Sequence, residues 1–346
     1  MTHTFNLPEE FITRYKTFIE WTRNNPLPPY CKSIYWEKQS SEITINAGDD
    51  TITVSGKSGY YIPPLAGESN TIKCLYRTAR RLYPTKLKMM TFEEAFDAVM
   101  RHDPIADIDL SPHRLNFRYL ATKGACRSIR DLKLRYFAQH KYELNHSMIY
   151  AHYLLNIIRD YFKDRPHSIM EIGAGNGNLA SLLYDTYMPK MVIVDLPEVM
   201  LLSMPFIADL FPKAKILMPH EEITSKDLDS YNFYFLTPAQ VEQIGDNSID
   251  LTVCVNAFQE MTHKQIREHF DLVNRVCKNN GKFLVVSRSE KIPAVNLLKK
   301  ESTVPVNRFH EYPWRVGNKV LVNEECKLLR LVDIVNSCIR LEEVRK

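Results

Sequence analysis

The arrangement of apolar and polar positions along the chain changes near residue 165. Beyond Pro166, apolar runs of strand length alternate with longer segments whose apolar residues recur at helical spacing. The predicted strands are SIMEIG (168–173), MVIVDLP (191–197), NFYFLTP (232–238), IDLTVCVNAF (249–258) and GKFLVVSRS (281–289). Because strands that alternate with helices usually pair in parallel, this half of the chain predicts an α/β fold with a doubly wound sheet.

The preceding half has a different pattern. Residues 42–56, EITINAGDDTITVSG, alternate apolar and polar positions on both sides of a Gly-Asp-Asp turn, which predicts a β-hairpin. Helical periodicity follows in residues 91–100, 128–140 and 145–162. We therefore expect an N-terminal, mostly helical accessory or lid region at residues 1–141 and a sheet domain at residues 142–346.

Composition and charge narrow the class of protein. The chain has 346 residues, of which 45% are hydrophobic and 25% charged, which is ordinary for a globular protein. Its formal net charge of +4 is spread along the chain, so we expect no nucleic-acid partner. The seven cysteines include no CxxC pair, which favours free thiols over disulfides or a zinc site. No apolar run reaches about 18 residues, so we expect a cytoplasmic protein with no membrane partner.

A glycine-rich turn joins the first predicted strand to the helix after it. Gly173, Gly175 and Gly177 stand at alternate positions, where glycine permits positive φ and close approach of a ligand. A dinucleotide fingerprint, GxGxxG, would require glycine where Asn178 stands, which weakens that interpretation. Asp195 ends the second strand, where a carboxylate can accept hydrogen bonds from ribose hydroxyls. The turn thus predicts a cofactor with an adenosine part.

Ligands of doubly wound sheets lie beyond the carboxyl ends of the strands. The candidate cofactor-binding residues are therefore those of the glycine turn and of the strand ends. They are Gly173, Ala174, Gly175, Gly177, Asp195, Leu196, Pro238, Ala239, Gln240, Asn256 and Ala257.

Several motifs resemble those of a known family. EIGAGNG (171–177) resembles motif I of class I S-adenosylmethionine-dependent methyltransferases, and VDLP (194–197) resembles their acidic second-strand end. A narrower resemblance is to sugar O-methyltransferases. It rests on Asp195–Glu198, Asn256, Phe258–Met261, Arg288 and Tyr312–Trp314, with Ser287 in place of an expected asparagine.

The resemblance implies a Rossmann-like class I methyltransferase fold, S-adenosyl-L-methionine as cofactor, and a sugar or glycosylated small molecule as substrate. It also implies that the methionine part of the cofactor crosses the glycine turn, where a Cβ at Gly173 or Gly175 would occupy its space. Gly177 would let the following helix start close to the sheet. Glu171 would lie beneath the turn and orient either the turn or the cofactor's amino group.

Methyl transfer to a hydroxyl requires a group that removes the proton. Glu260 and His263 are the first candidates, because they stand three apart at the start of a predicted helix and could share a face. Alternatively, Glu260 is an early-helix acid favoured by the helix dipole, and His263 is a surface residue. Further catalytic candidates are His310 and Glu290, and Arg288, which is better suited to holding an anionic group of the acceptor.

No metal is expected, because the fourth strand ends in Asn256-Ala257 rather than in a pair of acids. Aromatic residues of two loops could contact the acceptor or seal a domain boundary: Tyr60, Tyr61, Tyr312 and Trp314. Other functions stay open at this point. They are methylation of a natural product or a protein, an NAD-dependent oxidoreductase, and a catalytically silent cofactor-binding module. Assembly of identical copies also stays open.

Overall fold

The computed structural model describes residues 2–28, 31, 43–56, 146–162, 164–222, 230–291, 295–296, 301–302, 306–329 and 334–346. The chain divides into two compact units. Residues 1–60, 164–326 and 335–346 form the first, and residues 61–163 and 327–334 form the second. This division differs from a boundary at 141/142, because the first 60 residues belong to the same unit as the sheet.

Some predicted features lie outside the described residues. They are the helices at 91–100 and 128–140 and the loop after Gly56, with Tyr60 and Tyr61. In the second unit, the helix predicted at 145–162 is confirmed as α8 (His146–Tyr161). Its buried side chains include Ala151, Leu154, Leu155 and Ile158, which follow helical spacing.

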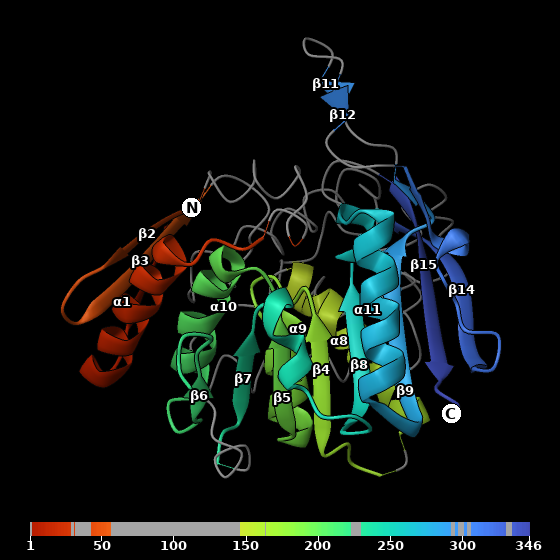
Figure 1. Cartoon of the computed structure of the whole chain (residues 1–346), viewed down its shortest axis with the longest axis horizontal. Helices are drawn as coiled ribbons and strands as arrows, with labels where there is room; N and C mark the ends of the chain where they lie inside the picture. Colours follow the sequence, from red (N-terminus) through yellow and green to blue (C-terminus); the bar gives the residue numbers. More distant parts are fainter. Residues whose placement is uncertain are drawn as a thin grey trace, which may run out of the picture. The chain divides into compact units, whose positions relative to one another are not determined.

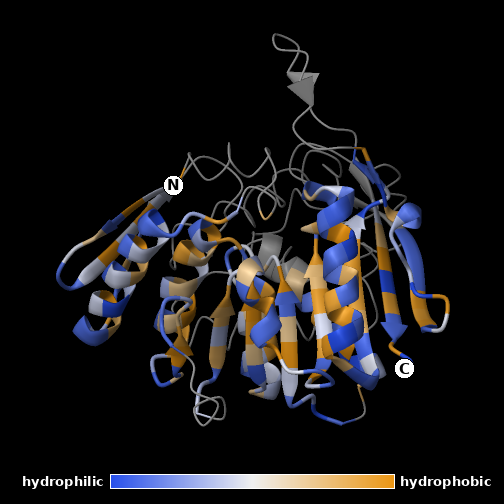
Figure 2. Cartoon of the chain, viewed as in Figure 1, coloured by the Kyte–Doolittle hydropathy of each residue, from blue (hydrophilic) through white to orange (hydrophobic). Residues whose placement is uncertain are grey.

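The first unit is built on a sheet that has eight strands within the described residues, in the order β14-β15-β9-β8-β4-β5-β7-β6 (Figure 1). Their bounds are β4 (Ser168–Ile172), β5 (Lys190–Val194), β6 (Ile216–Leu217), β7 (Phe233–Leu236), β8 (Ile249–Val255), β9 (Cys277–Arg288), β14 (Lys319–Leu329) and β15 (Ile334–Glu343). The neighbouring strands β9-β8-β4-β5-β7-β6 all pair in parallel, and β15 is antiparallel to β9. The predicted Rossmann-like, doubly wound sheet is therefore confirmed, and hydrophobic residues concentrate on its strands (Figure 2).

The chain order reverses at β4, which lies between β5 and β8. The helices that follow the strands are α9 (Asn178–Tyr187), α10 (Pro197–Leu210) and α11 (His263–Val276). Right-handed crossovers that run in opposite directions place α9 and α11 on opposite faces of the sheet. Alternation along β4 agrees, because Met170 and Ile172 join the hydrophobic cluster around α11, whereas Glu171 hydrogen-bonds Ala180 of α9. Ligands of such sheets bind at this reversal.

Helix α10 is apolar on nearly every side, and almost all of its residues are buried. A helix of this kind must be covered on two faces. Part of the cover comes from the N-terminal segment, where α1 (Glu9–Asn24) and β1 (Thr2–Asn6) both contact α10. Strand β1 belongs to a small antiparallel sheet of order β1-β3-β2, with β2 (Ile43–Ala47) and β3 (Thr51–Gly56). The hairpin predicted at 42–56 is confirmed as β2 and β3, whereas β1 and α1 were not predicted.

Tyr15 and Arg14 make polar contacts that attach α1 to the rest of the first unit. The Tyr15 hydroxyl donates to the carbonyl oxygen of Leu201, within α10, at 2.6 Å. Arg14 donates from Nε and Nη2 to the carboxylate of Glu221, which follows β6, at 2.6 and 2.8 Å. The buried residues of α1, Phe11, Ile12, Tyr15 and Phe18, form one stripe. The N-terminal segment is thus an integral part of the first unit.

Short elements complete the described chain. They are the 3-10 turns η3 (Pro238–Gln243), η4 (Phe258–Glu260) and η5 (Phe309–Glu311), and the strands β10 (Glu290–Lys291), β11 (Val295–Asn296), β12 (Glu301–Ser302) and β13 (Asn307–Arg308). Strand β10 pairs with β13, and β11 pairs with β12, in both cases antiparallel.

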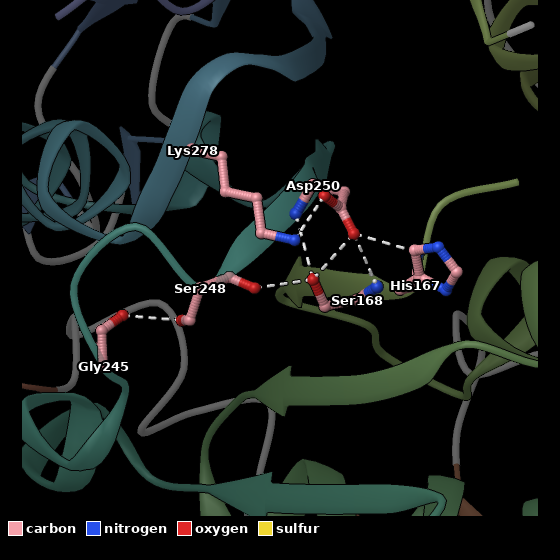
Figure 3. A network of polar contacts seen from close by, with 6 residues as sticks. All are labelled: His167, Ser168, Gly245, Ser248, Asp250 and Lys278. Carbon is pink, nitrogen blue, oxygen red and sulfur yellow. Dashed lines mark hydrogen bonds and ion pairs between the residues drawn. The ribbon is translucent and has the colours of Figure 1, made fainter. Parts of the chain in front are cut away.

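The amino-terminal ends of β4 and β8 are joined by a network around Asp250 (Figure 3). Its carboxylate accepts hydrogen bonds from the backbone N–H groups of His167 (2.9 Å) and Ser168 (3.0 Å), and from Lys278 Nζ (2.7 Å). Partial burial by itself raises the pKa of Asp250, but the bond from Lys278 and those from residues 167 and 168 hold it below its ordinary value. This network lies at the amino-terminal ends of the strands, opposite the ends at which ligands of such sheets bind, and is structural.

We expect Asp250→Asn to lower the free energy of unfolding by about 1–3 kcal/mol near neutral pH. The one amide oxygen can accept either from the two N–H groups or from the ammonium, and the NH2 group then faces the remaining donors. A depressed folded-state pKa contributes stability above the unfolded value of about 3.9, and this stability is lost as pH falls through the folded value. The difference between parent and variant should therefore shrink below about pH 4. Urea unfolding across pH tests this, with the exposed Asp246→Asn as control. Equal losses in the two variants would contradict the assignment.

Candidate cofactor site and active site

The glycine turn at residues 173–177 connects β4 to α9. Gly173, Gly175 and Gly177 have φ of +71°, +60° and +82°, a region that other L residues rarely adopt. Gly177 is the residue immediately before α9. The backbone alone therefore explains why glycine stands at each position.

The three glycines differ in what a side chain would meet. A Cβ at Gly173 would collide with the Cβ of Ala257, after β8, so the expectation that it would fill ligand space is wrong at this position. A Cβ at Gly177 would lie 3.1 Å from Ile207 Cδ1 in α10, so this glycine permits close approach of two helices rather than of helix and sheet. At Gly175 nothing lies within 4 Å. Of the three, Gly175 is the one that a ligand can approach.

Asp195 follows β5 and holds the turn in place. Its Oδ2 accepts from the Gly175 N–H at 2.9 Å, and its Oδ1 accepts from the Leu196 N–H at 2.8 Å. Each carboxylate oxygen keeps a second lone pair, which suits the predicted ribose contact. The side chain is 8% exposed, and burial raises its pKa to about 7 against the lowering effect of these two bonds. The charges of Glu198 and Glu260 raise the pKa of Asp195 further.

Glu171 lies in β4 and is 2% exposed. The backbone N–H of Ala180, in α9, hydrogen-bonds its carboxylate, while Oε2 has no hydrogen-bond partner. Burial, followed by the charge of Asp195, raises the pKa of Glu171 to about 8. A buried carboxyl group with an open acceptor costs stability, and such groups cluster at functional sites.

Acidic groups therefore gather where β4, β5 and β8 end. Glu171 and Asp195 repel each other, and Glu260, in the turn after β8, adds to the field at Asp195. Burial is the main cause of both raised pKa values, and repulsion by the neighbouring carboxylates adds to it. A ligand that brings positive charge would relieve this repulsion, whereas a diphosphate would add to it.

The ends of β7 and β8 carry the other predicted cofactor-binding residues. Thr237 precedes η3, and Gln240 Oε1 accepts from its N–H at 2.9 Å. Gln240 Nε2 donates to the carbonyl oxygen of Pro219 at 2.8 Å, so this amide is engaged within the protein. Pro238 and Ala239 open the same turn. Asn256 has φ of +60° after β8, a left-handed conformation that asparagine tolerates better than most residues.

Glu260 and His263 do not share a helix face, contrary to the expectation from their spacing. Glu260 ends the separate turn η4, and α11 begins at His263 with Thr262 as its N-cap. Glu260 Oε1 forms an ion pair with Lys291 Nζ at 3.1 Å, and the two side chains are only 16% and 11% exposed. The structure thus supports Glu260 as a carboxylate held in one place.

His263 is exposed, and its Nε2 lies 3.0 Å from the carbonyl oxygen of Val306. Because a carbonyl oxygen only accepts, we assign the proton to Nε2. In the neutral ring, Nδ1 is then the nitrogen that could take a proton.

The remaining predicted residues have separate surroundings. Arg288 ends β9, and its backbone N–H donates to Gln259 Oε1 at 3.0 Å. Glu290 is ion-paired with Arg308 at 2.8 Å, and His310 lies in η5 with a side chain that is 74% exposed. None of these contacts tests the catalytic roles predicted for Arg288 and His310.

Tyr312 and Trp314 pack against the core. Tyr312 is buried beside Phe258 and Phe270, and its hydroxyl lies 3.0 Å from Ser287 Oγ. Trp314 Nε1 donates to the carbonyl oxygen of Phe309 at 3.0 Å. Both side chains thus have a packing role in the structure.

Lys291 was missed from the sequence. Nothing in the spacing connects position 260 with position 291, because the ion pair forms only once β10 lies beside η4. Gln259 lay within a quoted motif, but its bond to the Arg288 backbone could not be predicted from local pattern.

Among the described residues, no helix is both long and apolar enough to span a bilayer. In the same residues, no group of three or more His, Cys, Asp or Glu side chains is placed to hold a metal ion.

Comparison with known proteins finds similarity in structure only. No protein-family model and no curated protein sequence matches the chain. A S-adenosylmethionine-dependent methyltransferase from Methanosarcina mazei is 12% identical, with 55% of this chain and 98% of that chain covered and a TM-score of 0.38. The PH0226 protein from Pyrococcus horikoshii is 17% identical, with 56% and 88% covered and a TM-score of 0.34.

Phosphoethanolamine N-methyltransferase 2 from Haemonchus contortus, solved with S-adenosyl-L-methionine, is 12% identical over 56% of this chain, with a TM-score of 0.37. The match covers 52% of that chain, about half its length. Similarities this weak transfer neither a ligand nor a reaction to this protein.

Proposed function

We propose that this protein is an S-adenosylmethionine-dependent methyltransferase that methylates a hydroxyl of a sugar or glycosylated small molecule. One observation carries the cofactor part: a glycine turn that is open at Gly175 lies beside the buried carboxyl groups of Glu171 and Asp195. The assignment of a sugar acceptor rests on the resemblance of residues 195–198 and 258–261 to sugar O-methyltransferase motifs. The motif at residues 312–314 adds less support, because it packs against the core.

The acidic site favours S-adenosylmethionine over NAD. S-Adenosylmethionine carries a sulfonium and an ammonium, whereas the pyrophosphate of NAD would bring two negative charges towards Asp195 and Glu171. Gly175 would admit the cofactor to the backbone, Asp195 would accept from the ribose, and Glu171 would face its positive charge. When bound, the cofactor supplies an activated methyl group.

The chain's own residues would then align the acceptor and remove its proton. Glu260 stands after β8 in an ion pair with Lys291, which fixes the position of its carboxylate. His263 offers Nδ1 because Nε2 is bound to Val306. Labelled cofactor, offered with nucleotide sugars, glycosides, aglycone natural products and protein, tests the proposal. Label in a sugar hydroxyl supports it, and label only in another class overturns the acceptor part.

We expect Gly175→Val to abolish binding of S-adenosylhomocysteine, because the side chain would fill the open space beside Asp195. Its positive φ adds a backbone cost of roughly 1–2 kcal/mol, so thermal unfolding must show that the variant folds. Gly317→Val is the matched control, since Gly317 also has open space around it and lies in another loop. Calorimetry with S-adenosylhomocysteine and NAD reports binding. Unchanged affinity in a folded Gly175→Val protein would show that the glycine serves only the turn.

We expect S-adenosylmethionine binding to release protons and to tighten as pH rises from about 6 to about 8. Without ligand, the raised pKa values of Glu171 and Asp195 keep part of their carboxyl groups protonated in this range, and a cationic ligand lowers both pKa values. Calorimetry in buffers of different ionisation enthalpy measures the released protons. Glu171→Gln should reduce their number. Proton uptake, or equal release by the variant, would contradict this expectation.

We expect Glu260→Gln or His263→Ala to lower turnover by about a hundredfold, depending on which residue takes the proton, while cofactor affinity is retained. Glu268→Gln, which changes an exposed glutamate of α11, is the control. Because Glu260→Gln leaves Lys291 without its carboxylate, thermal unfolding is measured alongside. If both variants turn over at the parental rate, neither residue is the base.

A further inference from the structure

Asn307 is a buried polar residue that the proposed chemistry does not yet use. It lies in β13, is 1% exposed, and stands directly opposite Lys291 in the pairing of β13 with β10. Its Nδ2 donates to the carbonyl oxygen of Met261 at 2.8 Å. The carbonyl oxygens of Gln259 and Phe258 lie at 3.3 and 3.4 Å from the same nitrogen.

These carbonyl groups surround Glu260. The last carbonyl groups of a helical turn lack partners within the turn, and a turn as short as η4 has little internal bonding to define its shape. Asn307 supplies the missing donor from a segment distant in sequence. On the other side, Gln259 Oε1 accepts from the Arg288 N–H, so the turn is held from both β9 and β13.

The same segment contacts the second candidate base. Val306, the neighbour of Asn307, accepts the hydrogen bond from His263 Nε2, and Lys291 opposite Asn307 is the ion-pair partner of Glu260. The positions of both candidate bases therefore depend on residues 306–307 and on β10, the strand that pairs with β13.

Packing alone does not explain an asparagine at this place. Its Oδ1 is buried without a hydrogen-bond partner, which carries a desolvation cost. A leucine of similar volume would fill the space without that cost, but it could not donate to the carbonyl groups of η4.

We propose that Asn307 is a positioning residue for methyl transfer, whose amide holds the Phe258–Met261 turn so that Glu260 stays beside the glycine turn. The position of this turn matters because Ala257, which immediately precedes it, lies against Gly173. The proposal rests on the proposed function, since it assigns Asn307 a role in that reaction.

The test compares Asn307→Ala and Asn307→Asp with Asn318→Ala. Asn318 donates to Glu342, which pairs with Phe283 far from the carboxyl end of β9, so the control removes an amide hydrogen bond away from the site. We expect Asn307→Ala to lower kcat about tenfold or more, with the Kd for S-adenosylhomocysteine within about twofold of the parent. Amide hydrogen exchange in residues 255–263 should accelerate, and the control should change neither quantity.

Asn307→Asp keeps the shape and separates donor loss from cavity formation. Its ionised carboxylate cannot donate, whereas the protonated form can donate to one carbonyl group. We expect kcat, relative to the parent, to recover as pH is lowered, a response that Asn307→Ala should lack. If the alanine variant does not fold, this isosteric variant carries the test.

Unchanged exchange in residues 255–263 overturns the proposal, and so does faster exchange with an unchanged kcat, which would leave Asn307 a purely structural residue. Failure of the parent protein to bind S-adenosylhomocysteine is a different result, because it refutes the proposed function. The role in methyl transfer then falls with it, although faster exchange would still show that Asn307 holds the turn.

Discussion

Burial of α10 is the constraint on which the first unit depends. The helix is apolar nearly all round, so the sheet alone cannot remove it from water. The N-terminal segment provides further cover and is tied to α10 by the bond from Tyr15 to Leu201. Helix α10 begins directly after Asp195 and Leu196. The contacts that fix this helix therefore also fix Asp195, whose carboxylate accepts from the Gly175 N–H of the glycine turn. Gly177 rests against the same helix, through Ile207.

Two aspartates at opposite ends of the strands have pKa values that their surroundings shift in opposite directions. Asp250 faces an ammonium and two N–H groups, and its pKa is lowered. Asp195 also accepts from two N–H groups, yet burial and neighbouring carboxylates raise its pKa. The first arrangement is satisfied without a ligand, whereas the second gains if positive charge arrives. This contrast, rather than the presence of acids as such, supports the proposed cofactor site at the carboxyl ends of β4 and β5.

The regular parts of the fold could be predicted from local patterns. The five predicted strands correspond to β4, β5, β7, β8 and β9, because a buried parallel strand is a short apolar run bounded by turn residues. The glycine turn was recognised for the same reason, since its conformation is required within a few residues. Strand β1 and helix α1 were missed. Glu260 and His263 were placed on one helix because spacing alone does not show that Thr262 begins a new one.

What the sequence settles about this protein is local: where strands and helices form, that glycine is needed at 173, 175 and 177, and that an acid follows the second strand. Each depends on φ, on side-chain alternation or on helical periodicity, which act between near neighbours. Tertiary structure decides which glycine faces open space, which carboxyl group is unsatisfied, and which partners hold Glu260. These properties depend on contacts such as Asn307 with Met261 and Tyr15 with Leu201, which exist only once distant segments have packed together.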